Sequence, residues 1–275
     1  MEHNGRQVGT FITTKEHRRF VEFANAVRKH RYIGLCYGAA CVGKTLSARR
    51  YAHWDIAEPF LEECTARVDP AAPEIRETLA RSRTVFYTPT VLETLRNLCE
   101  SLSNLIGRAE DSIDEHLHRD KPDYRGSKSK GLVEILIFDE AERLSMTALE
   151  FIRTIFDRTG VGVILVGMPG MEKRISRYQQ LYSRVGFAHH YRALTGDKLS
   201  FVLTRHWRSL GINLDEADFT DAQAIASIAR LTSGNFRLLH RLFIQIERIM
   251  KINELTVITS EVVEAARSTL VIGAT

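Results

Sequence analysis

The sequence predicts an α/β protein with a parallel sheet between two layers of helices, followed by a small all-helical domain. Three observations support this prediction. A glycine-bracketed loop separates a strand from a helix at residues 38–45, a near-continuous apolar run at 132–138 ends in two carboxylates, and alternating strands and helices give way to helices alone after residue 195. Alternating elements indicate a parallel sheet, because parallel strands need a crossover that is usually helical.

The loop follows the apolar run 32–37 and has the pattern G-x-x-x-x-G-K-[ST], made by Gly38, Ala39, Ala40, Cys41, Val42, Gly43, Lys44 and Thr45, with Leu46 continuing the helix. In this pattern the loop N–H groups and the helix N-terminus surround the phosphates of a nucleotide. Lys44 is expected to reach the β- and γ-phosphates, and the Thr45 hydroxyl to face Mg²⁺. Cys41 stands where many such loops carry glycine, so the loop is strained if the torsion there favours glycine.

Composition sets the broad class. The chain has 275 residues, 44% of them hydrophobic, which is ample for a buried core. A formal charge of +4 permits nucleic-acid binding without requiring it. Its four cysteines have neither metal-ligand spacing nor disulfide density, the N-terminus has no signal-peptide pattern, and no apolar run approaches the roughly 18 residues of a membrane span. We therefore expect a cytoplasmic protein without a membrane segment.

The N-terminal region, residues 1–31, is expected to form a basic helix that packs on the core. Thr13 and Glu16 make a plausible capping box, and Phe20, Phe23 and Val27 recur at helical spacing. Its basic residues fit a solvated face better than a DNA-facing one. Residues 55–83 are then expected to form short helices, because three prolines interrupt any long periodic pattern.

Residues 84–87 predict a second strand, and 91–105 an amphipathic helix. The following charged segment contains Arg125, Lys128 and Lys130. Such a basic loop suits contact with the phosphates of DNA, but a solvent-exposed loop has the same composition. The sequence leaves both interpretations open.

The run at 132–138 predicts a strand buried on both faces of a parallel sheet, and it leads directly into Asp139 and Glu140. Ligands of open α/β sheets bind at the carboxyl ends of the strands, so this pair is expected beside the phosphate loop. Asp139 would hold Mg²⁺, usually through water, and Glu140 would orient and polarise the attacking water.

The rest of the α/β domain, residues 32–194, is expected to contain a helix capped by Ser145 and ending at Gly160, a buried strand at 161–166, a helix at 171–181 and a short strand at 188–191. Residues 195–275 predict a helical domain with helices at 197–210, 220–232, 235–252 and 260–270. Thr220 and Gln223 suggest a capping box there.

Taken together, these motifs resemble the P-loop NTPases of the AAA+ ATPase type, with a three-layer core and a helical lid. More narrowly, the chain resembles the transposition regulators of the TniB, TnsC and Mu B type. The narrower resemblance rests on the loop end 41–45 and on the runs 138–144, 165–169, 180–184 and 234–237.

The resemblance implies roles for two arginines. Arg184 matches an arginine finger that completes the site of a neighbouring subunit, with Arg174 and Arg177 as competitors, and Arg237 matches the arginine of the lid that contacts the γ-phosphate. Gly167 and Met168 depart from the family pattern, because many members place a polar residue at the tip of this strand. That departure puts the rate of hydrolysis in doubt more than nucleotide binding.

The function that the resemblance implies is an ATP- and Mg²⁺-dependent ATPase that forms a homo-oligomeric ring or filament on duplex DNA. It would recruit or activate a transposase, with a possible target selector, and hydrolysis would drive disassembly. The alternatives are a DNA-independent switch, such as a secretion-associated or signalling ATPase, and a replication initiator or loader. The latter usually carry a dedicated DNA-binding domain, and none is evident after the lid.

Overall fold

The computed structural model describes residues 11–62, 71–118, 131–212, 214–215 and 217–270. The chain forms two compact units. The larger unit holds residues 19–39 and 43–191, and the smaller unit holds residues 1–18, 40–42 and 192–275. The segment 119–130, and with it the candidate DNA contacts Arg125, Lys128 and Lys130, lies outside the described residues.

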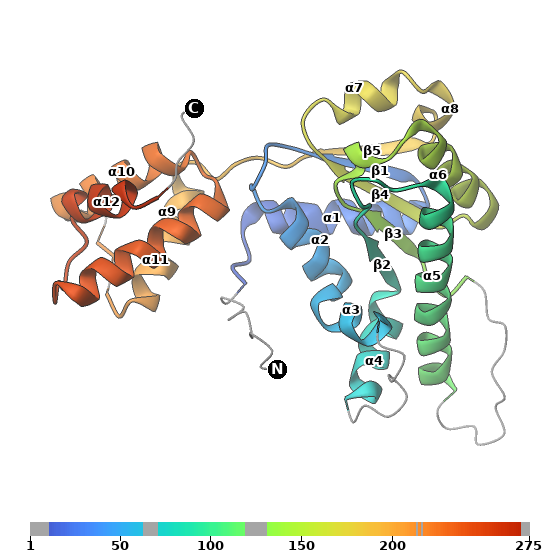
Figure 1. The fold of residues 1–275 in the computed structure, drawn as a ribbon, viewed down its shortest axis with the longest axis horizontal. Coiled ribbons are helices and arrows are strands. Elements are labelled where there is room, and N and C mark those ends of the chain that lie inside the picture. Colours follow the sequence, from blue (N-terminus) through green and yellow to red (C-terminus); the bar gives the residue numbers. More distant parts are fainter. Residues whose placement is uncertain (1–10, 63–70, 119–130, 213, 216, 271–275) are drawn as a thin grey trace. The chain divides into compact units, whose positions relative to one another are not determined.

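The larger unit is built on a sheet of five parallel strands in the order β2-β3-β4-β1-β5 (Figure 1). Their bounds are β1 Ile33–Tyr37, β2 Thr84–Tyr87, β3 Ile135–Phe138, β4 Gly162–Gly167 and β5 Val185–His190. Strands β1, β3 and β4 are almost wholly buried, as expected for near-continuous apolar runs in a parallel sheet. The predicted fold class is confirmed.

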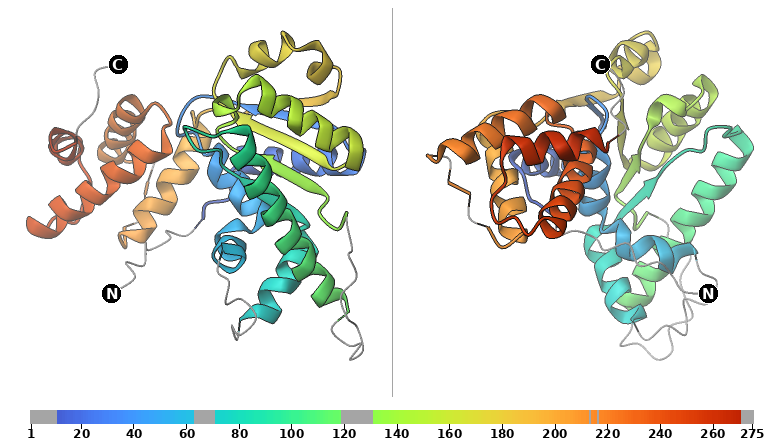
Figure 2. Two further views of the ribbon diagram at one scale, coloured as in Figure 1. Left: turned by 45° about the vertical axis from the view of Figure 1, so that its right-hand side comes forward. Right: turned by 60° about the vertical axis from the view of Figure 1, so that its left-hand side comes forward.

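Helices cover both faces of the sheet (Figures 1 and 2). Helices α1 (Lys15–His30), α2 (Lys44–Ala52) and α3 (Trp54–Glu62) lie on one face. Helices α5 (Leu95–Leu117), α6 (Met146–Thr159), α7 (Met171–Ser176) and α8 (Gln179–Tyr182) lie on the other. Helix α4 (Ala72–Ser82) packs against α5 and α3, and a 3₁₀ turn, η1 (Ala141–Arg143), follows β3.

The smaller unit contains helices α9 (Asp197–Ser209), α10 (Phe219–Thr232), α11 (Phe236–Ile252) and α12 (Ser260–Ser268). Its own core is closed by Trp207, which is fully buried, and by the buried stripe of α11, Leu239, Leu242, Phe243 and Ile246. Ile249 of the same helix is only partly buried and packs against the edge of this core.

Two predicted helix starts were wrong, because a different side chain accepts from the first N–H groups of each helix. Helix α1 is capped by the Thr14 hydroxyl, which accepts from the His17 N–H at 3.1 Å, so Thr13 is not the cap. The carboxylate of Glu16 instead binds the Lys198 ammonium at 2.7 Å within the smaller unit. Helix α10 is capped by Asp218 rather than Thr220, because the Asp218 carboxylate accepts from two N–H groups of the first turn.

Two further differences concern helix continuity. Pro59 lies inside α3 instead of ending it. The helix predicted at 171–181 is divided into α7 and α8, so a turn precedes Arg184. The predicted cap Ser145 and the predicted helix end at Gly160 are confirmed. The helix predicted from residue 235 begins at Phe236, because Asn235 is its cap. Among the described residues, no helix has the length and apolar character needed to span a membrane.

Candidate nucleotide-binding and hydrolysis site

The glycine-bracketed loop connects β1 to α2 at the carboxyl edge of the sheet. Gly43 adopts φ 105°, a torsion that side chains disfavour, just before α2 begins at Lys44. The Lys44 ammonium is buried and donates to the Gly38 carbonyl at 2.7 Å and the Ala39 carbonyl at 2.6 Å. The N–H groups of this ammonium are also the donors that phosphate oxygens would accept from. The two carbonyls therefore hold the Lys44 charge at the phosphate loop.

The loop is tightly fixed at its start and bent at its middle. A Cβ added at Gly38 would lie 2.2 Å from the Tyr191 carbonyl oxygen, so this position requires glycine. Cys41 adopts φ 59°, which is the left-handed conformation, and its carbonyl accepts from the Phe236 N–H at 2.9 Å. The strain expected if Cys41 occupied a glycine-favoured torsion is therefore present.

Asp139 follows β3 and is 3% exposed. Burial raises the pKa of its carboxyl group, while a hydrogen bond with the Thr45 side chain opposes that rise, as does the charge of Lys44 to a smaller extent. The sequence-predicted pair Thr45 and Asp139 is thus brought together. A hydroxyl and a carboxylate are hard oxygen ligands, so the donor set fits Mg²⁺.

Glu140 occupies a left-handed conformation at φ 46°, at the start of the turn η1. Its carboxylate pairs with Arg143, three residues further along the same turn. The Arg143 guanidinium also donates to the Pro89 carbonyl at 3.0 Å, after β2. Glu140 is more exposed than Asp139, with 44% of its side chain accessible, so the two carboxylates have different environments.

The tip of β4 has a neighbour that the sequence did not reveal. A Cβ at Gly167 would lie 2.8 Å from the Glu142 Oε2 and 2.5 Å from the Met171 sulfur. The carboxylate of Glu142 therefore occupies space that a side chain at residue 167 would need. Arg174 fixes this turn by donating to the backbone carbonyls of Glu142, at 2.8 Å, and Leu144. Glu142 was visible in the Asp139–Arg143 run, but only the fold places it beside β4.

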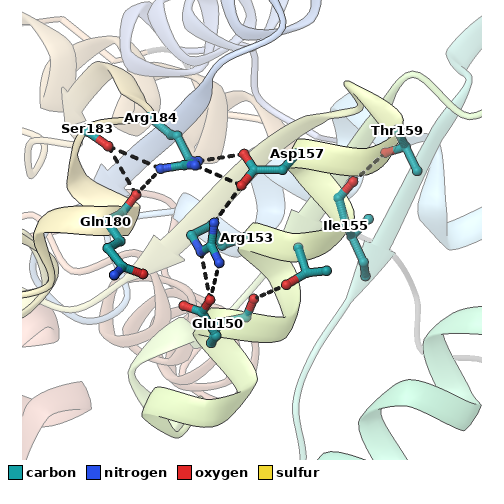
Figure 3. Close-up of polar contacts among 9 residues, drawn as sticks. Glu150, Arg153, Ile155, Asp157, Thr159, Gln180, Ser183 and Arg184 are labelled. Carbon is teal, nitrogen blue, oxygen red and sulfur yellow. Dashed lines mark hydrogen bonds and ion pairs between the residues drawn. The ribbon is translucent and has the colours of Figure 1, made fainter.

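Arg184 directly precedes β5, which begins at Val185 and so earlier than the predicted strand at 188–191, and its side chain is held by its own chain (Figure 3). Its guanidinium binds both carboxylate oxygens of Asp157, at 2.5 and 2.8 Å, and the Gln180 carbonyl. Asp157 also accepts from Arg153 at 2.6 Å, and hydrogen bonding to Arg184 lowers the pKa of Asp157. Of the two competitors, Arg174 is tied to η1 while Arg177 is exposed.

The remaining candidates are less constrained. Arg237 is exposed in the first turn of α11 and follows Phe236, whose N–H donates to the Cys41 carbonyl. Leu46 is 55% exposed on α2. Within the described residues of the larger unit, the polar contacts of the Arg184 guanidinium are with Asp157, Gln180 and Ser183 and not with the phosphate loop. Among the described residues there is no cluster of three or more metal-ligating side chains of the His, Cys, Asp and Glu types.

These features define a class. A parallel sheet with β4 between β1 and β3, a phosphate loop after β1 and a buried Asp after β3 are the arrangement of a P-loop nucleotide-binding protein. Residues 27–175 match the AAA domain family. The chain is also 43% identical over 267 residues to a "potential ATP-binding protein" of Staphylococcus aureus, covering 96% of this chain and 97% of that protein. The protein therefore belongs to the AAA domain family.

Solved structures are similar in fold. The Thermotoga maritima RuvB Holliday junction branch migration motor matches with a TM-score of 0.57 and 16% identity, over 94% of this chain and 70% of that one. The Aeropyrum pernix ORC2 protein, solved in ADPNP and ADP complexes, matches with a TM-score of 0.55 and 12% identity, over 95% of this chain and 70% of that one. At these low identities the likeness is one of fold alone.

Proposed function

We propose that the protein hydrolyses ATP and uses the cycle to regulate DNA transposition as an oligomer on duplex DNA. The hydrolysis part rests on one observation: the fold places the buried Asp139 at the end of β3 beside Lys44 and Thr45 of the phosphate loop, where both side chains oppose the rise in its pKa. Lys44 and the loop N–H groups would bind the phosphates, and Thr45 and Asp139 would hold Mg²⁺, which supplies charge neutralisation when bound. Glu140 would orient the attacking water once it is released from Arg143.

Two variants separate binding from chemistry. Lys44→Ala removes the ammonium that faces the phosphates and should abolish ATP binding. Glu140→Gln keeps the loop intact, so it should retain ATP affinity and lose turnover. ATP affinity and phosphate release are measured for both variants, and equal loss of affinity in both would refute the role given to Glu140.

We further propose that Arg184 acts in a neighbouring subunit. Its position before β5 supports this role, and its partner Asp157 lies at the surface, with 31% of its side chain accessible. Solvent screens this pair, and Asp157 keeps Arg153 as a partner when Arg184 leaves, so its carboxylate is not left uncompensated. A planar guanidinium can then stabilise the charge that develops on the γ-phosphate.

A mixing experiment tests the trans role. Arg184→Ala subunits should bind ATP but turn over slowly, and Lys44→Ala subunits should not bind it. In a head-to-tail assembly, mixing the two creates junctions that pair an intact loop with an intact Arg184, so activity should partly return. If co-assembled mixtures do not exceed the sum of the two variants, the trans role passes to Arg177, because Arg174 is held by the carbonyls of η1.

The DNA and transposition part is supported by the sequence runs that resemble the TniB, TnsC and Mu B type. One protein of similar fold adds indirect support, since it is described as a Holliday junction branch migration motor. Negative-stain imaging with a slowly hydrolysed ATP analogue, with and without duplex DNA, tests it directly. Ordered assembly that needs both nucleotide and DNA supports the proposal, whereas assembly indifferent to DNA would favour a DNA-independent switch.

A further inference from the structure

Helix α11 carries a basic stripe along its exposed face. The stripe consists of Arg237, Arg241, Arg248 and Lys251, with Ile244 between them, and all five residues are exposed. Their spacings of three and four residues keep them on one side of the helix. The opposite side, which includes Leu239, Leu242 and Ile246, is buried in the core of the smaller unit. The stripe is therefore a surface feature of a firmly packed helix.

The cations of the stripe differ from two other exposed arginines of the smaller unit, Arg230 and Arg267. None of the four has an ion pair or side-chain hydrogen bond in the described part of the chain, whereas Arg230 and Arg267 both bind Glu264, at 3.1 and 3.0 Å. The helix itself offers a single acid, Glu247. Like charges three or four residues apart repel each other on a helix. The stripe thus costs stability within the subunit, which favours a role in binding an anion outside it.

We infer that the basic stripe of α11 binds the phosphate backbone of duplex DNA. From residue 237 to 251 the helix rises by about 21 Å, a length over which a duplex presents roughly 12 charges. Three of the four cations are guanidinium groups, which bind phosphate oxygens in pairs. An anionic membrane fits less well, because the apolar face that would insert is already buried in the protein core.

This inference rests on the proposed function, since it names the surface that would contact DNA. The test variant is Arg241→Gln, Arg248→Gln and Lys251→Gln in the full chain. Arg237 is left unchanged, because the family resemblance implies a contact between this residue and the γ-phosphate. The control variant is Arg96→Gln, Arg230→Gln and Arg267→Gln, which makes the same charge change at exposed cations that are paired with carboxylates. Circular dichroism and ATP affinity verify that both variants are folded.

The measurement is the affinity for a labelled duplex in the presence of ATP analogue over a range of salt concentrations. Each lost phosphate contact should reduce the magnitude of the slope of log K against log salt by about 0.9, so this magnitude should fall by up to about 2.7 in the stripe variant. The stripe variant should also bind the duplex at least about tenfold more weakly at physiological salt. The control should keep the wild-type slope. Glu247→Gln removes the only acid on the helix and should tighten binding, which gives a second test in an otherwise unchanged chain.

The outcomes distinguish this inference from the proposed function. A wild-type protein that binds no DNA in any nucleotide state refutes the DNA part of that function. If wild type binds DNA with a steep salt dependence but the stripe variant matches the control, the function stands and the α11 inference is refuted. Polyglutamate serves as an acidic-protein probe. A stripe variant that loses polyglutamate binding but keeps DNA binding would reassign the surface to an acidic partner.

Discussion

Replacing Gly38 with alanine should disrupt the start of the phosphate loop. The new Cβ would lie 2.2 Å from the Tyr191 carbonyl oxygen, while ordinary contact begins at 3.4 Å, so about 1.2 Å of movement is required. Tyr191 resists that movement, because its N–H donates to the Tyr37 carbonyl at 2.8 Å and its hydroxyl is bonded to Ser47 at 2.8 Å. Overpacking of this kind typically costs about 1–3 kcal/mol. We expect a loss of about 2–3 kcal/mol in the free energy of unfolding.

The matched control is Gly107→Ala. Gly107 lies inside α5, and a Cβ there meets nothing within 4 Å. Alanine should therefore stabilise this helix by about 0.5–1 kcal/mol. Urea denaturation of both variants gives the difference, and ATP binding should weaken only for Gly38→Ala, because its carbonyl holds the Lys44 ammonium. A Gly38→Ala protein as stable as wild type would refute the argument from close approach.

Three further predictions concern the same edge of the sheet. Burial raises the pKa of Asp139, so ionising it lowers stability as pH rises above its unfolded-state pKa of about 3.9. Asp139→Asn should therefore stabilise the nucleotide-free protein at pH 7, and urea titrations should show the gain shrinking toward pH 4. Cys41→Gly should relieve the left-handed strain and raise the free energy of unfolding by up to about 1 kcal/mol, whereas Cys41→Val should lower it. Glu142→Gln should leave ATP affinity within about twofold and slow turnover at least about tenfold, if its carboxylate beside Gly167 helps to orient water; unchanged turnover would exclude that role.

The sequence by itself determined the fold class and the residues of the phosphate loop. Hydrophobic runs such as 132–138 are long enough to identify buried parallel strands, because both faces of each strand must be apolar. The loop pattern specifies its own chemistry, since backbone N–H groups, one ammonium and one hydroxyl are provided by eight consecutive residues. The cap Ser145 was predictable for the same reason, because the interaction is local.

The tertiary structure decided what depends on residues distant in sequence. The Glu16 carboxylate binds the Lys198 ammonium and forms no capping box with Thr13. Glu142 lies beside Gly167, and Arg184 is bound to Asp157. The torsion of Cys41 and the close approach of Gly38 to Tyr191 also needed the folded chain. Local patterns encode which backbone a segment adopts, but the partner of a long charged side chain is set by whichever segments the sheet and helices bring within its reach.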